Sequence, residues 1–471
     1  MSFGYERLLA HKNNMMGGQP PNGDDCRNID TLQINVEINC VAFHPHLPMF
    51  ATGNRHGHTN LWRLNDDSTL AQRTPVDTLV GHSDYVTFHP QLPIVATGSP
   101  AGIVKLWRLN DDGTLAEPTS VATVRGRNHE IISIAFHPRL PIFATGGSDN
   151  GTAESCSVKL WRLNDDYTLV GQGPISTLIR HTGRVTSIAF HNHLPIIATG
   201  SHDRTVNVWH LNDDGSLAQT TPVATLVGHT SLVRCVAFHP LLPIIATGSY
   251  DRRLKLWRLN DDGTLLQPTP IDTLNIGSRV ICVTFHPWYP MFATTSDELV
   301  ISHAIKLWRL NDDGTLAQHT PISRLRGHTL FVTSIAFHSR LPIIVTGSDD
   351  GTAKLWQCKM LEPPHHLEIL RKETDIPENV RSAPCALCNL PLCAQIPDTT
   401  YNINGYVVKM TSAHYFHYNC IHRYLTNRQS ISELMTCPTC ESVIDSDEIS
   451  RFLHSPDADA DAKLCTDFYI P

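Results

Sequence analysis

Short apolar runs separated by turn residues recur along most of the chain in one repeated order. Around residues 233–265, the run VRCVAFH ends near a Leu-Pro pair, and IIATGS and LKLWRL follow, rich in β-branched and aromatic residues. Runs of this kind are typical of β-strands. The segment LNDDG at 259–263 offers the positive-φ positions of a tight hairpin, after which PIDTL returns as a fourth strand. Each copy is therefore predicted to form four antiparallel strands.

The copies are spaced like the blades of a propeller. A lone sheet of four short strands cannot bury both of its faces, so the copies must stack, and closing them into a ring also protects the end sheets. The spacing is close to the repeat of about 40–45 residues that is typical of propeller blades. We therefore predict an all-β fold, a seven-bladed propeller over residues 28–357. One tryptophan marks each copy: Trp62, Trp107, Trp161, Trp209, Trp257, Trp308 and Trp356.

The segment before the first full copy predicts how the ring closes. NIDTL at 28–32 matches VDTL at 76–79 and IDTL at 271–274, which are fourth strands, yet it precedes the first copy. We expect it to pair with the seventh copy and latch the ring. HHLEILRK at 365–372 is the alternative latch, or else a linker helix. Residues 1–27 are rich in Gly, Pro and Asn and are predicted to be a disordered tail.

Three copies resemble the WD-repeat family in full, with a Gly-His before the first strand, an Asp in the turn after the second and a Trp in the third. The resemblance implies hydrogen bonds in series from Trp to Ser to His to Asp, which leave no polar atom of the imidazole unpaired. Ser, His and Asp also fit a catalytic triad, but threefold repetition in a structural module argues against that reading. The three sets are His181, Ser201, Asp203 and Trp209; His229, Ser249, Asp251 and Trp257; and His328, Ser348, Asp350 and Trp356.

The copies differ from one another mainly on one side of the predicted ring. FHPxLP and LNDDGTL barely change, whereas the residue six before the Phe of FHP, on the Gly-His face, is Glu37, Glu130, Arg184, Leu232, Arg279 or Phe331. A surface that binds an asymmetric partner needs different chemistry on each blade; drift in exposed loops is the alternative. We predict that this face binds a protein substrate with an acidic or phosphorylated segment, and that Glu37 and Glu130 lie across the ring from the basic residues. The predicted substrate-binding residues are Arg184, Arg204, Arg252 and Arg279.

The histidines of the FHP segments repeat around the ring and are predicted to be turn residues. Side chains related by the ring's symmetry cannot converge within the roughly 2.1 Å of a zinc–nitrogen bond. A shared metal site is therefore excluded for this set.

Composition narrows the class of partner. The chain has 471 residues and a formal net charge of −8, with no cluster of Lys and Arg, so nucleic acid is not expected as a partner. The first residues lack the apolar core of a signal peptide, and no apolar run approaches the roughly 20 residues of a membrane span. We expect no membrane insertion and an intracellular location, cytoplasmic or nuclear.

The cysteines gather near the end of the sequence and predict zinc. Seven of the 13 lie at 385–465, paired as C-x-x-C with histidines between them, which favours zinc in a reducing compartment over a disulfide framework. After a linker at 358–384, the order resembles a RING finger of the two-histidine type over 385–444, followed by a tail at 445–471. The family's interleaved pattern implies two Zn²⁺ ions, one held by Cys385, Cys388, His417 and Cys420, the other by His414, Cys437 and Cys440.

The second zinc site departs from the family pattern. Ser412 stands where the family has a third-ligand Cys, so this site is short of one thiolate. Cys393, a water molecule or the Ser412 hydroxyl are the candidates for the vacant position.

The RING resemblance implies a function in ubiquitin transfer. RING fingers have no nucleophile and hold a charged ubiquitin-conjugating enzyme in a reactive geometry. Leu387, Tyr424 and Pro438 match the family's docking surface for that enzyme, whereas Glu441 stands where active ligases often have an Arg. The sequence thus predicts a single-chain ubiquitin ligase whose propeller selects the substrate. The alternative is a non-catalytic scaffold or vesicle-tethering subunit with an architectural RING.

Overall fold

The computed structural model describes residues 26–358, with gaps at 66, 82–83, 126–128, 150–155, 172, 241, 261, 288, 298–302, 312 and 340, and three later strand segments. The chain divides into two compact units, Pro20–Glu362 and Met1–Gln19 with Pro363–Pro471. In the latter unit the described strands form one antiparallel sheet in the order β29-β30-β31. These strands are β29 (Glu368–Leu370), β30 (Val407–Lys409) and β31 (Tyr415–His417).

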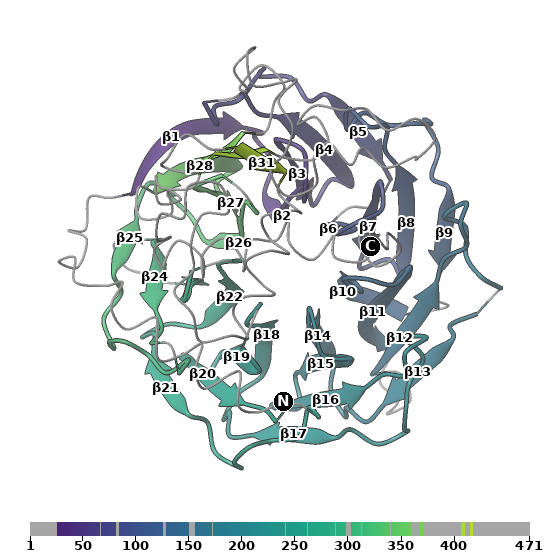
Figure 1. The fold of residues 1–471 in the computed structure, drawn as a ribbon, viewed down its shortest axis with the longest axis vertical. Coiled ribbons are helices and arrows are strands. Elements are labelled where there is room, and N and C mark those ends of the chain that lie inside the picture. The colour runs from purple at the N-terminus through teal and green to yellow at the C-terminus, as the bar shows by residue number, and fades with distance from the viewer. Residues whose placement is uncertain are drawn as a thin grey trace. The chain divides into compact units, whose positions relative to one another are not determined.

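The described residues of the unit Pro20–Glu362 form seven four-stranded antiparallel sheets arranged around a centre, as predicted (Figure 1). We number the blades from first to seventh by the chain order of their inner strands. The inner strands are β2 (Ile38–Phe43), β6 (Tyr85–Phe88), β10 (His129–Phe136), β14 (Val185–Phe190), β18 (Val233–Phe238), β22 (Val280–Phe285) and β26 (Val332–Phe337). The second strands are β3 (Met49–Asn54), β7 (Ile94–Ser99), β11 (Ile142–Asp149), β15 (Ile196–Ser201), β19 (Ile244–Ser249), β23 (Met291–Ser296) and β27 (Ile343–Ser348).

The remaining two strands of each blade lie farther from the centre. The third strands are β4 (His58–Arg63), β8 (Ile103–Arg108), β12 (Ser157–Arg162), β16 (Thr205–His210), β20 (Arg253–Arg258), β24 (Ile305–Arg309) and β28 (Thr352–Cys358). The outer strands of the first six blades are β5 (Asp77–Val80), β9 (Ala122–Arg125), β13 (Ser176–Ile179), β17 (Ala224–Val227), β21 (Asp272–Asn275) and β25 (Ser323–Leu325), and that of the seventh is β1 (Cys26–Gln33).

The hydrophobic core lies between neighbouring sheets. The strand IIATGS of the fifth blade is buried along its whole length, as are the corresponding strands of blades one, two, four, six and seven. One cluster joins Ile244 and Leu256 of the fifth blade to Phe292 and Trp308 of the sixth. No blade therefore completes a core by itself, which is why the copies stack.

The ring closes through β1, as the sequence predicted. β1 pairs antiparallel with β28 in the sheet β1-β28-β27-β26, and Leu32 is buried in the core between the seventh and first blades. A disulfide between Cys26 and Cys358 joins the two strands, a bond that the cysteine pattern did not predict. The alternative latch is wrong, because Glu368–Leu370 forms β29 and pairs with β30.

The FHP histidines form a closed ring of contacts. Each imidazole Nδ1 accepts the backbone N–H of the residue three positions later, at 2.9–3.0 Å, as Leu92 does for His89. Each imidazole also meets the FHP Phe of the next blade, with ring centroids 4.9–5.2 Å apart. They are turn residues, as predicted, and they also join neighbouring blades.

Burial keeps five of these histidines neutral. It lowers the pKa of His44, His89, His137 and His191 to about 4 and that of His286 to about 3. Since Nδ1 accepts a hydrogen bond, the proton of the neutral ring lies on Nε2.

The described part of the chain holds no helix with the length and hydrophobicity that a membrane crossing requires.

Candidate functional site: the Gly-His face of the propeller

The hydrogen-bond series around each repeat tryptophan corrects the sequence analysis. In the fourth blade, Trp209 Nε1 donates to Thr199 Oγ1 at 3.2 Å, His181 Nε2 lies 2.8 Å from the same oxygen, and His181 Nδ1 lies 2.8 Å from Asp203 Oδ2. The fifth and seventh blades repeat this series with Thr247 and Thr346. The hydroxyl in the series is therefore the threonine of ATGS and not the serine.

Strand register explains the difference. Trp209 lies opposite Ile197, so Thr199 is its diagonal neighbour on the same face, whereas Ser201 lies at the strand end. Ser201 Oγ donates instead to the carbonyl of Gly183, at 2.7 Å, and accepts the backbone N–H of Asp203. The serine thus ties the loop carrying Gly-His to the turn carrying Asp.

The buried carboxylates of this series stay ionised. Burial alone would raise the pKa of Asp203, but hydrogen bonds with His181 and Thr205 outweigh it and hold that pKa far below its usual range. Asp350 behaves alike, because contacts with His328 and Thr352 overcome the effect of burial. These groups hold one another in place, which supports a structural role over a catalytic one.

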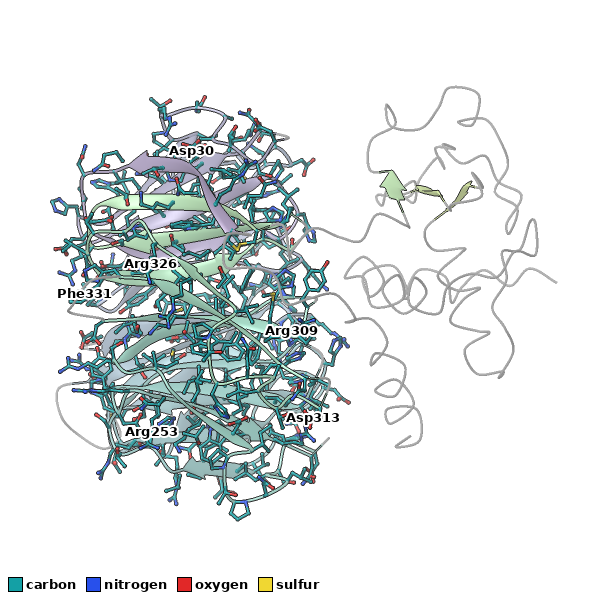
Figure 2. All side chains as sticks on the ribbon, turned by 90° about the vertical axis from the view of Figure 1, so that its left-hand side faces the viewer. Asp30, Arg253, Arg309, Asp313, Arg326 and Phe331 are labelled. Carbon is teal, nitrogen blue, oxygen red and sulfur yellow. A yellow bond between two sulfur atoms is a disulfide. The ribbon has the colours of Figure 1, made fainter. Side chains whose placement is uncertain are left out.

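The two faces of the propeller carry different residues. Figure 2 shows Phe331 and Arg253 on one side and Arg309 and Asp313 on the opposite side. On the side with Phe331, backbone hydrogen bonds pair the residue that varies between copies with a residue of the turn after the second strand. We call these pairs the lip; four of them are Arg184 with His202, Leu232 with Tyr250, Arg279 with Asp297 and Phe331 with Asp349.

The arginines of the lip are ion-paired within the propeller. Arg184 lies 2.5 Å from Glu130, and Arg279 lies 3.6 Å from Asp297 and over the ring of Tyr250. Glu37 is likewise ion-paired with Arg55, at 2.6 Å. The expectation that Glu130 lies across the ring from the basic residues is wrong, because it belongs to the third blade and neutralises its neighbour in the fourth.

Arg204 and Arg252 differ from the lip arginines. Both are exposed, with φ values of 73° and 68°, at the same position of the tight turn that follows the second strand. The side chain of neither forms an ion pair with any residue that the structure describes. Of the four predicted substrate-binding arginines, these two thus retain an unpaired positive charge.

Arg234 is a charged residue of this region that the sequence analysis missed. It is half-buried at the start of the inner strand β18, where the register with β19 shifts between Val233 and Cys235. Its positive charge acts on Cys40, Tyr85 and Cys282, which belong to the inner strands of three other blades. Figure 1 shows these inner strands around the centre of the ring. A charge that acts on three of them from β18 lies on the side of β18 that faces this centre.

Comparison with known families agrees with this architecture. A family model described as WD domain, G-beta repeat matches residues 28–63, 73–108, 118–162, 172–210, 220–258 and 319–357. Residues 26–358 form a WD-repeat propeller. As such it is a scaffold for protein–protein interactions, and its variable Gly-His face is the candidate site. Among curated proteins, none matches the chain.

The predicted zinc ligands and conjugating-enzyme contacts fall almost wholly outside the described residues. The exception is the backbone of His417, which ends β31 and pairs with Val407. The described residues bring together no group of three His, Cys, Asp or Glu side chains that could hold a metal ion. The two zinc sites stay a prediction from the cysteine and histidine spacing.

Proposed function

We propose that the protein is a RING-type ubiquitin ligase in which the Gly-His face of the propeller binds the substrate and the RING segment binds the charged conjugating enzyme. One observation carries the substrate-binding half. The Gly-His face changes its chemistry from blade to blade and leaves Arg204 and Arg252 unpaired, whereas the opposite face repeats one turn and one His–Phe contact. Such asymmetry suits recognition of an asymmetric protein partner.

The ligase half rests on the ligand spacing from Cys385 to Cys440 and the matching docking residues. Zinc would be held by Cys385, Cys388, His417 and Cys420, and by His414, Cys437 and Cys440 with Ser412 or Cys393. The metal's contribution is structural, because it would order the surface formed by Leu387, Tyr424 and Pro438. Catalysis would consist of positioning the thioester, with no nucleophile from this chain.

An autoubiquitination assay with a panel of conjugating enzymes tests the ligase half. The full-length protein should form ubiquitin chains with at least one enzyme, and Leu387→Ala should abolish this without releasing zinc. A matched control is Leu266→Ala, since Leu266 is 54% exposed on the propeller. No product with any enzyme would contradict ligase activity.

The second candidate function is a non-catalytic assembly subunit. It is favoured by Ser412 and Glu441, the two positions at which the RING segment departs from the pattern of active ligases. In that case zinc removal would dissociate a multiprotein complex captured through the propeller, while the ubiquitination assay would stay negative. The same Gly-His face would still bind the partner.

A further inference from the structure

The position of Arg234 is set by a feature that six blades share. In each of them the register between the inner and second strands shifts at one residue, so this residue leaves the ladder. Arg234 occupies that position in the fifth blade. It follows Leu232 and Val233, and Leu232 belongs to the lip, so Arg234 lies one step inside the Gly-His face. The corresponding residues of the other blades are Asn39, Asp84, Ile132, Thr186, Ile281 and Thr333.

The polar residues of this set are largely satisfied within the propeller. Asn39 Nδ2 donates to Asp84 Oδ1 at 3.0 Å, and Thr186 Oγ1 donates to the carbonyl of Val233 at 2.6 Å. Thr333 Oγ1 donates in the same manner to the carbonyl of Ile38 in the next blade. Arg234 differs, because it forms no ion pair with any described residue.

A half-buried guanidinium without a counter-ion is an unusual arrangement. It has five N–H donors in a planar fork that matches a carboxylate, and a buried charge is normally paired. The lip arginines Arg184 and Arg279 are already neutralised by Glu130 and Asp297. Arg234 therefore retains a positive charge that is available to a ligand, and Arg204 and Arg252 retain theirs on the same Gly-His face, while Asp84 brings a carboxylate to the corresponding position of the second blade.

The neighbours of Arg234 limit the kind of ligand. Leu232 and Tyr250 form the lip pair of the same blade, so the part of the lip that precedes Arg234 in the chain carries an apolar and an aromatic residue. His202 of the fourth blade lies close enough that Arg184 and Arg234 add to the effect of burial in lowering its pKa. A bare inorganic anion would leave the apolar part of this surface unused.

We infer that Arg234 receives an Asp or Glu side chain of the bound protein, with an apolar residue beside that side chain packing on Leu232 and Tyr250. This inference rests on the proposed role of the Gly-His face, and it names the residue that selects the ligand. Arg204 and Arg252 attract the acidic segment through long-range charge, whereas Arg234 forms the bidentate contact that distinguishes a carboxylate from an amide.

The test uses the full-length protein and pairs of 12-residue fluorescent peptides. One member of each pair has a central Glu-Leu or Asp-Leu, and the other has Gln-Leu or Asn-Leu. The wild type should prefer the acidic member by about tenfold to a hundredfold, as expected for a charge-assisted contact. Arg234→Gln should remove that preference and Arg234→Lys should restore part of it. Arg309→Gln removes the same charge from the opposite face (Figure 2) and should change nothing.

A second measurement reports on the site directly. A carboxylate bound at Arg234 offsets the positive charge near His202, so the acidic peptide should raise the pKa of His202 in NMR titrations of the wild type but not of Arg234→Gln. A merely structural Arg234 would not produce this change. Circular dichroism of each variant checks that the propeller is folded.

The outcomes separate this inference from the proposed function. Equal acidic preference in Arg234→Gln, or none in the wild type, overturns the inference. Binding of inorganic phosphate alone, lost in Arg234→Gln while peptides fail to bind, also overturns it in favour of a small-anion site. If a captured protein partner is lost in the double variant Arg204→Glu, Arg252→Glu but not in Arg234→Gln, the face proposal stands and the inference fails. If neither variant affects that partner, the face proposal itself fails.

Discussion

The FHP histidine ring should make the propeller sensitive to mild acid. In the unfolded chain these histidines have a pKa near 6.5, whereas burial lowers the pKa of His44, His89 and His191 to about 4 and that of His286 to about 3. Between these values the unfolded state binds more protons than the folded state. The free energy of unfolding must therefore fall as the pH falls from about 7 toward 4.

The size of the effect follows from these pKa values. For one histidine with a folded pKa of about 4, going from pH 7 to pH 5 costs the folded state about 2 kcal/mol. For the four nearly fully buried histidines together, the free energy of unfolding falls by about 8 kcal/mol between pH 7 and pH 5. This loss is comparable to the roughly 5–15 kcal/mol that stabilises a typical domain. Asp203 and Asp350 add almost no loss in this window, because a carboxyl of the unfolded chain, with a pKa near 3.8, is still ionised at pH 5; their contribution is lost at lower pH.

Urea unfolding, followed by tryptophan fluorescence, measures this loss of free energy of unfolding. The fluorescence reports on the propeller, because all eight tryptophans lie in residues 62–356. We expect the midpoint to fall steeply between pH 7 and pH 5. His89→Gln should lower the free energy of unfolding at pH 7, but the variant has one buried histidine fewer to protonate in acid. The difference in free energy of unfolding between variant and wild type should therefore shrink by about 2 kcal/mol at pH 5. His319→Gln is the control, because the His319 side chain is 67% exposed. A wild-type midpoint that stays constant over this range would refute the reasoning.

Three further predictions follow from the same structure. Thr247→Val leaves a buried tryptophan N–H and a buried imidazole without partners and should cost about 2–4 kcal/mol in urea unfolding, whereas Ser249→Ala should cost about 1 kcal/mol; equal losses would contradict the corrected series. Cys26→Ser should lower stability by about 2–4 kcal/mol and make it insensitive to dithiothreitol, and an effect of dithiothreitol on the variant would argue against the disulfide as its cause. Zinc chelation should unfold the predicted RING at 385–444 but leave tryptophan fluorescence unchanged, with the second ion leaving first; two equally tight ions would instead implicate Cys393 or Ser412, which Cys393→Ser would decide.

The architecture of the propeller was predictable because every copy of the repeat carries the same sequence signals for four strands. Seven tryptophans at near-constant spacing, a Leu-Pro break and an LNDDG turn all favour the same four strands, and a misplaced fourth strand at 28–32 predicts the latch. Local signals agree with one another, and stacking is the only way to bury both sheet faces.

The contacts between strands were less predictable. Thr199 and Ser201 are both hydroxyl residues two positions apart on the same face, and only the register against Trp209 decides which one it meets. Arg234 lies among apolar residues of an inner strand, and a bulge places it outside the ladder. Arg184 pairs with Glu130 because the third and fourth blades are neighbours in the ring. The order of the repeats in the sequence already implied this neighbourhood, but comparing the variable residues one position at a time did not reveal the ion pair.

The closure of the ring by β1 has a consequence for how the protein is made. β1 is synthesised before the other strands of the propeller, and its partner β28 follows about 320 residues later. β1 therefore has no pairing strand until the ribosome has synthesised all the blades. At roughly 5–20 residues per second this delay is on the order of 20–60 s. Any nascent chain released before Cys358 keeps the open edges of an unclosed ring, and such edges are the surfaces on which chaperones and proteases act. Completion of the last strand is thus the event that separates a protected molecule from an exposed one.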